Sequence, residues 1–233
     1  MERYSIIHEK NPREIVLLRG SGCKWRRCTF CDYHLDASLD EEANFQLNKQ
    51  ELDKVTGIYR HLEVINSGSF TELDKQTCNY ILRVCKEQNI CLIHFECHWL
   101  YREQIQNLRQ EFTNIGVEVK IKIGVETFDH DFRENVLHKG IGEANPMHIA
   151  APFDEVCLLF GLGGQTSRSM ERDIQTGLAY FERVCVNVMV ENSTPVKPNR
   201  EVIRIFLQEI YPKYIENPRV DILINNTDFG VGA

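Results

Sequence analysis

Residues 20–33 read Gly20-Ser21-Gly22-Cys23-Lys24-Trp25-Arg26-Arg27-Cys28-Thr29-Phe30-Cys31-Asp32-Tyr33, and the rest of the chain is organised around them. Three cysteines fall within nine positions, in the spacing Cys-x4-Cys-x2-Cys. The apolar run 14–18 before them is typical of a buried strand, and Gly-Ser-Gly turns the chain out of it into a loop. The thiols therefore lie at the exit of a strand, where α/β sheets place their chemistry. The basic residues between them favour thiolates, the form that binds a metal.

Three interpretations of these cysteines stay open from the spacing alone. They are unconnected core thiols, a zinc site completed by His34, or ligands of an iron–sulfur cluster. Structural zinc sites usually pair two Cys-x2-Cys knuckles, and the sequence has no second knuckle. The spacing also matches a plant-type ferredoxin with a distant fourth ligand. The candidates for that ligand are Cys78, Cys85, Cys91 and Cys97. A four-iron cluster held by only three cysteines would instead leave one iron open to a small molecule.

Length and composition set the broad class. The 233 residues, 42% of them hydrophobic, suffice for one ordinary domain or two small ones with a sizeable core. The net charge of −7 argues against generic binding to nucleic-acid backbones. The first residues lack the apolar core of a signal peptide, and no apolar run reaches the roughly 18 residues of a membrane span. We therefore expect a cytoplasmic protein in which nine cysteines form no disulfide framework.

Segments typical of strands alternate with segments typical of helices along the chain. The expected strands are 15–18, 62–65, 90–97, 117–123, 155–160, 185–190 and 220–224. The expected helices are 49–60, 74–88 with Asp74 as N-cap, 102–113, 167–184 with Ser167 or Ser169 as cap, and 200–214. This alternation predicts parallel strands joined by right-handed crossovers. The predicted fold class is α/β, an open parallel β/α barrel of about six strands.

Polar and glycine-rich residues follow the predicted strands. In parallel sheets the ligand lies at the carboxyl ends of the strands, so these residues are the candidate site. They are Ser67-Gly68-Ser69, Glu96 to His98, Glu126-Thr127, Gly163 to Gln165, Glu191-Asn192 and Asn225 to Asp228. A simple electron carrier does not need a ring of polar strand ends, which disfavours the ferredoxin interpretation.

The loop and the strand order together resemble the radical S-adenosylmethionine superfamily. In that superfamily a strand leads into a three-cysteine loop that binds a four-iron cluster, and an aromatic residue precedes the last cysteine. Phe30 occupies that position here. The usual spacing is Cys-x3-Cys-x2-Cys, so this chain has one extra residue in the first gap. Longer first gaps occur in the superfamily, and we interpret the extra residue as a subfamily feature.

Three further segments are similar to superfamily motifs. Residues 66–69 are a degenerate form of the Gly-Gly-Glu turn that receives the methionine amino group, since only Gly68 matches and the acid is missing. Residues 124–127 resemble the segment that faces the ribose and carboxylate, and residues 160–166 resemble the glycine-rich turn on the adenine side. A lone glycine-rich turn is weak evidence, but all four motifs follow successive strands in the order of the superfamily.

The resemblance implies a single radical S-adenosylmethionine domain over residues 1–233. Cys23, Cys28 and Cys31 would hold a 4Fe–4S cluster whose fourth iron chelates the amino and carboxylate groups of S-adenosylmethionine. One-electron cleavage of that cofactor gives a 5′-deoxyadenosyl radical, which abstracts hydrogen from the substrate. The implied cofactor contacts are Phe30, Ser67, Gly68, Ser69, Glu126, Gly163 and Gln165.

The loop and the short length are similar to the bacterial queuine lyases, which release the aminomethyl-deazaguanine base from queuine for tRNA queuosine salvage. That resemblance implies a small-molecule substrate and a flavodoxin- or ferredoxin-like electron donor, with no direct contact to nucleic acid or membrane. Acids and amides at strand ends would pair the base edge, and aromatic rings would stack on its face. The candidate substrate contacts are Tyr33, Glu96, His98, Glu191, Asn192, Asn225 and Asp228, with Phe229 as a further stacking residue.

Two alternatives differ in class. One is another radical enzyme, such as a mutase, a dehydrogenase or a glycyl-radical activating enzyme. The other is a non-enzymatic iron–sulfur electron carrier, which a fourth cysteine ligand and no binding of S-adenosylmethionine would establish.

Overall fold

The computed structural model describes residues 2–66 and 68–224. The chain divides into two compact units, which we describe separately. The first comprises Met1–Lys24 and Tyr33–Ile121, and the second comprises Trp25–Asp32 and Lys122–Ala233. Strand β5, Glu118–Glu126, starts in the first unit and ends in the second.

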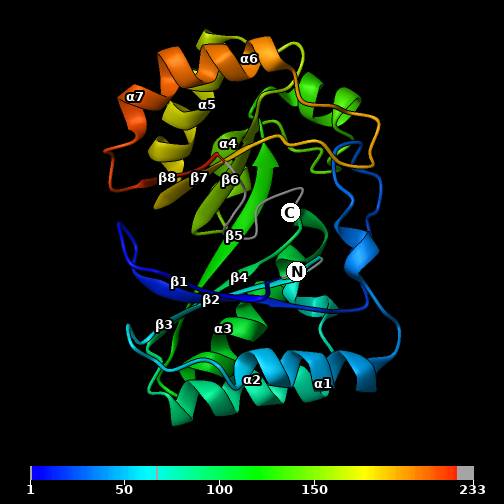
Figure 1. The fold of residues 1–233 in the computed structure, drawn as a ribbon, viewed down its shortest axis with the longest axis vertical. Helices are drawn as coiled ribbons and strands as arrows, with labels where there is room; N and C mark the ends of the chain where they lie inside the picture. The colour runs from blue at the N-terminus through cyan, green and yellow to red at the C-terminus, as the bar shows by residue number, and fades with distance from the viewer. Residues whose placement is uncertain (1, 67, 225–233) are drawn as a thin grey trace. The chain divides into compact units, whose positions relative to one another are not determined.

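The first unit is a small α/β layer built on parallel strands. Its whole strands β1 to β4 are Tyr4–Ile7, Arg13–Leu18, His61–Asn66 and Leu92–Glu96. Its α-helices α1 to α3 are Glu41–Leu52, Lys75–Glu87 and Ile105–Thr113, and its 3-10 helices η1 to η3 are Tyr33–Asp36, Phe70–Glu72 and Trp99–Gln104. β1 pairs antiparallel with β2, whereas β2, β3 and β4 pair in parallel. Figure 1 shows α1, α2 and α3 gathered on one side of these strands.

In the second unit, helices follow β5, β6 and β7. Strands β6 to β8 are Glu155–Phe160, Arg183–Val188 and Val220–Leu223. Helices α4 to α7 are Pro146–Ala150, Ser167–Tyr180, Arg200–Ile205 and Tyr211–Tyr214, and the π-helical turns η4 and η5 are Phe132–Val136 and Phe206–Ile210. β5 to β8 pair in parallel, and α5, α6 and α7 lie on one side of β6 to β8 (Figure 1). Phe160 and Phe206 meet edge to face at 5.5 Å in this core.

Charged side chains are buried at the beginnings of several strands. In the first unit Arg13 pairs with Glu63. In the second unit Arg183 lies 2.7 Å from Asp221 and 3.9 Å from Glu155. Arg13, Glu63 and Glu155 are buried, whereas Arg183 and Asp221 are half-buried. A buried charge is tolerated only when it is paired, and these charges pair with partners on neighbouring strands. The pairs occupy the amino-terminal parts of β2, β6 and β7, which leaves the carboxyl ends for other residues.

The structure corrects several predicted elements. The described chain has eight strands in the order β1 to β8, against about six predicted, and β1 was missed. The helix predicted over 49–60 is wrong, because α1 begins at Glu41, with Asp40 accepting the Ala43 N–H, and ends at Leu52. The helix predicted to reach residue 184 ends at Tyr180, and its cap is Thr166 instead of Ser167 or Ser169.

Other predicted elements are confirmed. β6 has the predicted bounds, and the helix predicted over 200–214 is continued through α6, η5 and α7. Asp74 caps α2 by accepting the Thr77 N–H at 2.8 Å. Across the described residues, no helix combines the length and the apolar character that crossing a membrane requires.

Candidate functional site

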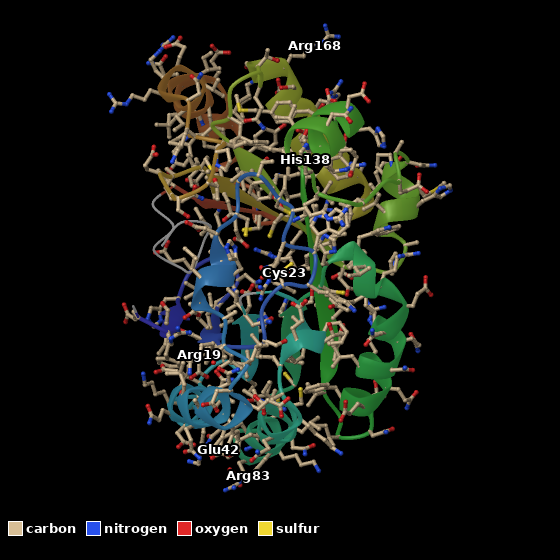
Figure 2. The ribbon with its side chains drawn as sticks, turned by 90° about the vertical axis from the view of Figure 1, so that its right-hand side faces the viewer. Arg19, Cys23, Glu42, Arg83, His138 and Arg168 are labelled. Carbon is tan, nitrogen blue, oxygen red and sulfur yellow. The ribbon has the colours of Figure 1, made fainter. Side chains whose placement is uncertain are left out.

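Where the cysteine loop leaves β2, asparagine side chains of α1 hold its first residue by hydrogen bonds. The Arg19 N–H donates to Asn48 Oδ1 at 2.7 Å, and the Arg19 side chain donates to Asn44 Oδ1 at 2.7 Å. Asn48 in turn donates to the Arg19 carbonyl at 2.8 Å. The loop therefore starts from a fixed backbone, and Cys23 follows on it half-buried in the first unit (Figure 2).

The turn after β3 lies beside Cys23. A Cβ atom built on Gly68 would lie 3.0 Å from the Cys23 backbone nitrogen. Ser69 is fully buried, and its hydroxyl accepts the His98 N–H at 2.9 Å. The structure thus brings the predicted cofactor contacts Gly68 and Ser69 next to the first cysteine. Ser67, also predicted, lies outside the described residues.

Three predicted substrate contacts also belong to the first unit. Glu96 ends β4 half-buried, and Tyr33 begins η1 half-buried. His98 caps η3, because its Nδ1 accepts the Leu100 N–H at 3.2 Å. One ring nitrogen of His98 is therefore already occupied by the chain itself.

Within the second unit, two distant segments hold Cys28 and Cys31 in place. Thr29, between them, donates its N–H to the Leu137 carbonyl at 3.1 Å, and its carbonyl accepts the Val196 N–H at 3.1 Å. The Asn192 side chain donates to the Phe30 carbonyl at 2.8 Å. Asn192, predicted as a substrate contact, is thus placed on the backbone of the cysteine loop. Figure 2 labels His138, which follows the first of these segments.

Trp25 packs on Gly140 at the start of this part of the loop. The indole N–H donates to the His138 carbonyl at 2.8 Å, and the Arg27 guanidinium lies 5.0 Å from the ring centroid. Gly140 has φ +72, and a Cβ built on it would lie within 2.5 Å of three Trp25 ring atoms. Only glycine therefore fits beneath this tryptophan.

Gly140→Ala should be clearly more destabilising than Gly142→Ala. Both glycines have positive φ, so alanine costs each about 1–2 kcal/mol in backbone strain. Nothing lies within 4 Å of a Cβ at Gly142, whereas at Gly140 the Trp25 ring must move, which adds about 1–3 kcal/mol. Urea unfolding of both variants measures the difference, and equal losses would show that the Trp25 contact contributes nothing.

Glu126, at the end of β5, forms a buried ion pair. Lys139 Nζ lies 2.7 Å from Glu126 Oε1 and 5.5 Å from the centroid of the Phe30 ring. Burial alone would lower the pKa of Lys139, but Glu126 and the nearby Cys28 and Cys31 sulfurs raise it above its usual value. The predicted contacts Phe30 and Glu126 thus lie beside one ammonium group, which favours negative charge at both cysteines.

The backbone at Glu126 is strained, and Asp173 fixes the two residues that follow it by hydrogen bonds. Glu126 has φ +69, a conformation that persists only when its surroundings fix it. Asp173, on α5, accepts the Thr127 hydroxyl at 2.7 Å and the Phe128 N–H at 2.9 Å. Burial raises the pKa of Asp173 to about 6, since these two bonds only partly compensate for lost water.

Asp173→Asn should stabilise the protein at neutral pH. The folded state binds this proton more tightly than the unfolded state, so this carboxyl makes stability fall as pH rises from 3.8 to about 6. In Asp173→Asn the amide oxygen can still accept the Phe128 N–H, and the amide nitrogen can donate to Thr127 Oγ1, so both contacts remain without the charge. We therefore expect a gain of about 1–3 kcal/mol at pH 7.5 that vanishes near pH 4. Urea unfolding across this pH range measures it, with the exposed Asp131→Asn as control. A lower stability at every pH would mean that the two donors require a charged acceptor.

The glycine-rich turn after β6 is braced by its own glutamine. Gln165 Oε1 accepts the Leu162 N–H at 2.9 Å, and Gln165 Nε2 donates to the Leu159 carbonyl at 2.8 Å. Gly163 is exposed on the same turn. Gln165, predicted as a cofactor contact, thus shapes the turn, while Gly163 presents backbone to the surroundings.

The remaining predicted contacts are less informative. Glu191 is exposed and pairs with Lys197 at 2.8 Å. Asn225, Asp228 and Phe229 lie outside the described residues. Among the described residues, Glu191 is therefore a solvent-exposed side chain in a surface ion pair.

The other cysteines differ from those of the loop. Burial raises the pKa of the Cys85 and Cys97 thiols to about 12 and that of the half-buried Cys78 to about 11, so all three stay protonated at neutral pH. His34, the zinc candidate, is exposed. Within the described chain, no three histidine, cysteine or acidic side chains gather as a single-ion site. Each cysteine of a cluster binds a different iron, so cluster ligands stand farther apart than the ligands of one ion.

Sequence reasoning missed three buried residues of the site: Glu72, Lys139 and Asp173. Glu72 is 6% exposed and bonds to the cysteine loop. Ser69-x-x-Glu72 is a capping-box pattern, and that signal marks Glu72 as part of the turn after β3. Lys139 and Asp173 carry no comparable signal, because their partners are remote in sequence.

Comparisons with known proteins agree with the predicted class. No family model matches the chain. The solved queuine lyase from Clostridium spiroforme, bound to SAM and queuine, is 42% identical, with a TM-score of 0.94 and 100% of both chains covered. Streptococcus suis SuiB is 10% identical, with a TM-score of 0.57 over 89% of this chain and 48% of SuiB.

Two other matches are weaker. SuiB bound to S-adenosylmethionine is 11% identical, with a TM-score of 0.53 over 90% of this chain and 49% of that one. Both SuiB structures show a shared fold alone. An uncharacterised protein of Methanocaldococcus jannaschii is 25% identical over 144 residues, 54% of this chain. The chain spans only 38% of that relative's length.

The match to the queuine lyase extends over the whole of both chains. It confirms the predicted fold class, an open parallel β/α barrel of the radical S-adenosylmethionine type. A core of parallel strands in sequence order, with a three-cysteine loop after β2, is common to the prediction and the structure. At 42% identity over its full length, the chain belongs to the queuine lyase family of radical S-adenosylmethionine enzymes.

Proposed function

We propose that this chain is a queuine lyase that releases the aminomethyl-deazaguanine base from queuine, for salvage into tRNA queuosine. The observation that carries the proposal is the full-length likeness to a queuine lyase bound to SAM and queuine. Residues 1–233 would act as one catalytic domain, and the cytoplasm is the proposed location.

The three loop cysteines fit a 4Fe–4S cluster. Cys23, Cys28 and Cys31 are half-buried, and the loop that carries them is fixed by bonds to remote segments of each unit. When bound, the cluster and S-adenosylmethionine supply a one-electron cleavage and a radical that abstracts hydrogen from the substrate. The protein's contribution is orientation and exclusion of water.

The cofactor contacts we propose are the residues at the ends of β3, β5 and β6. Gly68 and Ser69 offer backbone beside Cys23, and Gly163 offers exposed backbone after β6. Glu126 offers a carboxylate already neutralised by Lys139. Phe30, 2% exposed, covers the pair with an apolar ring. Gln165 would act through the turn that it braces, and Ser67 is proposed from the sequence alone.

The substrate contacts we propose are Tyr33, Glu96, His98, Glu191 and Asn192, together with Asn225 and Asp228 from the sequence. A deazaguanine presents N–H donors that a carboxylate such as Glu96 can accept. It also presents a flat face on which Tyr33 can stack. Asn192 keeps little hydrogen-bonding capacity, because its oxygen accepts from Thr194 while its nitrogen holds Phe30.

A flavodoxin- or ferredoxin-like electron donor is the proposed protein partner. Such donors are acidic, and Arg26 and Arg27 are exposed beside Cys28 in the sequence. Charge complementarity of this kind acts mainly on the rate of encounter, so donor-driven turnover should fall as salt rises.

The experiment that tests the proposal is a single anaerobic turnover. The cluster is reconstituted and reduced, S-adenosylmethionine is added, and 5′-deoxyadenosine is quantified with and without queuine. A burst that depends on queuine, with a released deazaguanine base, supports the proposal. Slow cleavage that queuine leaves unchanged would indicate another radical enzyme. An intact cluster without any cleavage would indicate an electron carrier.

A further inference from the structure

Glu72 holds the backbone on both sides of Cys23. Its Oε1 accepts the Lys24 N–H at 2.7 Å. Its main-chain carbonyl accepts the Ser21 N–H at 2.9 Å and the Ser21 hydroxyl at 3.2 Å. Glu72 is nearly buried, so these bonds form where water competes little and charge-assisted bonds are strongest. One residue outside the loop thus fixes the chain two positions before the cysteine and one position after it.

The same carboxylate also ties the loop to the turn after β3. Glu72 Oε2 accepts the Ser69 N–H at 2.6 Å, and Oε1 accepts the Tyr101 hydroxyl at 3.0 Å. A Cβ on Gly68 would overlap this carboxylate, so the turn packs against it without room for a side chain. Both oxygens are therefore occupied by donors of the chain itself, which suits an anchor of the loop.

We propose that Glu72 is the positioning residue that sets Cys23 for cluster binding. The inference rests on the proposed function, because it takes Cys23 as a cluster ligand. Groups that orient a metal ligand from outside typically change metal affinity by about 10- to 100-fold when they are removed. A buried carboxylate near the cluster also opposes the reduced, more negative form, so it should lower the reduction potential.

Glu14 provides a matched control within the same unit. It is fully buried and accepts the Thr56 and Gly57 N–H groups, each at 2.7 Å, and the Tyr4 hydroxyl at 2.7 Å. Glu14 thus shares the donor types of Glu72, two backbone N–H groups and one tyrosine, and also accepts the Thr56 hydroxyl at 3.2 Å. Its bonds hold the turn between α1 and β3 instead of the cysteine loop. Substitution at Glu14 therefore reproduces the loss of a buried carboxylate without touching Cys23.

The experiment compares the full-length wild type with E72A, E72Q, E14A and E14Q after anaerobic reconstitution. It measures iron and sulfide per chain, the rate of iron loss to a chelator, the reduction potential, and the unfolding free energy of the apoprotein. We expect E72A to hold the cluster about 10- to 100-fold more weakly than the wild type. E14A should lose comparable stability and hold the cluster normally.

The conservative variant separates geometry from charge. E72Q keeps an acceptor for Lys24, so it should retain more cluster than E72A, with a reduction potential shifted upward because a negative charge is gone. E14Q should leave the potential unchanged. Equal iron retention in E72A and E14A would overturn the inference. If E72A does not fold, wild-type retention and potential in E72Q would overturn it. A wild type that takes up no 4Fe–4S cluster would overturn the proposed function and this inference together.

Discussion

Cys28→Ser should leave the chain folded and remove its capacity to hold the cluster. Cys28 is only half-buried, so the exchange of sulfur for oxygen disturbs little packing. A serine hydroxyl stays protonated near neutral pH, whereas the ligand of iron is a thiolate. Two remaining cysteines cannot hold three irons, so iron per chain and S-adenosylmethionine cleavage should both fall to background. Cys23→Ser and Cys31→Ser should behave alike.

Two other cysteines are the controls for this prediction. Cys91 is exposed and its thiol donates to the Arg60 carbonyl at 3.3 Å, which a serine hydroxyl can also do, so Cys91→Ser should keep both iron and activity. Cys85 is 1% exposed in α2, so Cys85→Ser should lower the unfolding free energy but still bind the cluster. Full iron content in Cys28→Ser, or its loss in Cys91→Ser, would contradict the assignment of the cluster to the loop.

Elements with uninterrupted apolar strands or clear caps were predictable. β6 was predicted to the residue, because its six residues are all buried and flanked by polar turns. Asp74 correctly predicted the start of α2, because its carboxylate accepts the N–H of Thr77 in the first turn. Both depend on local chemistry, which is visible in a single sequence.

Elements stabilised by remote polar contacts were not predictable. α1 was misplaced because its buried face carries Asn44, Asn48 and Glu51, where an apolar stripe is expected. Those amides bind Arg19 at the entrance of the cysteine loop, so their burial follows from tertiary structure. β1 was missed because it is only four residues long and half-buried, and it forms by pairing with β2.

The candidate site was predictable in position more than in detail. The strand ends pointed to Ser69, Glu126 and Gln165, and each of these residues also forms a hydrogen bond that holds its own turn or strand end. The groups that support them, such as Glu72 and Lys139, lie in short turns whose role depends on partners far along the chain. A sequence pattern shows where parallel strands end, whereas the groups that support the site become visible only in the three-dimensional structure.

Lys139→Met should be among the most destabilising single substitutions in the second unit. Lys139 is paired with Glu126 at 2.7 Å, and their side chains are 12% and 5% exposed. Removing one partner leaves the other charge buried without compensation, which typically costs about 3–5 kcal/mol. Glu126→Gln should cost a similar amount, because the ammonium then loses the carboxylate that balances its charge. Urea unfolding of each variant measures the loss.

The double variant Lys139→Met/Glu126→Gln decides whether the pair itself causes the loss. With both charges gone, no buried charge is left unpaired, so the double variant should be more stable than the sum of the single losses predicts, by about 1–3 kcal/mol. Lys213→Met is the exposed control, since its pair with Glu171 at 2.9 Å is half-exposed and should contribute less than about 1 kcal/mol. Strict additivity would instead mean that Lys139 acts by packing against Phe30. In that case the apolar stem of Lys139, and not its charge, would support the loop between Cys28 and Cys31.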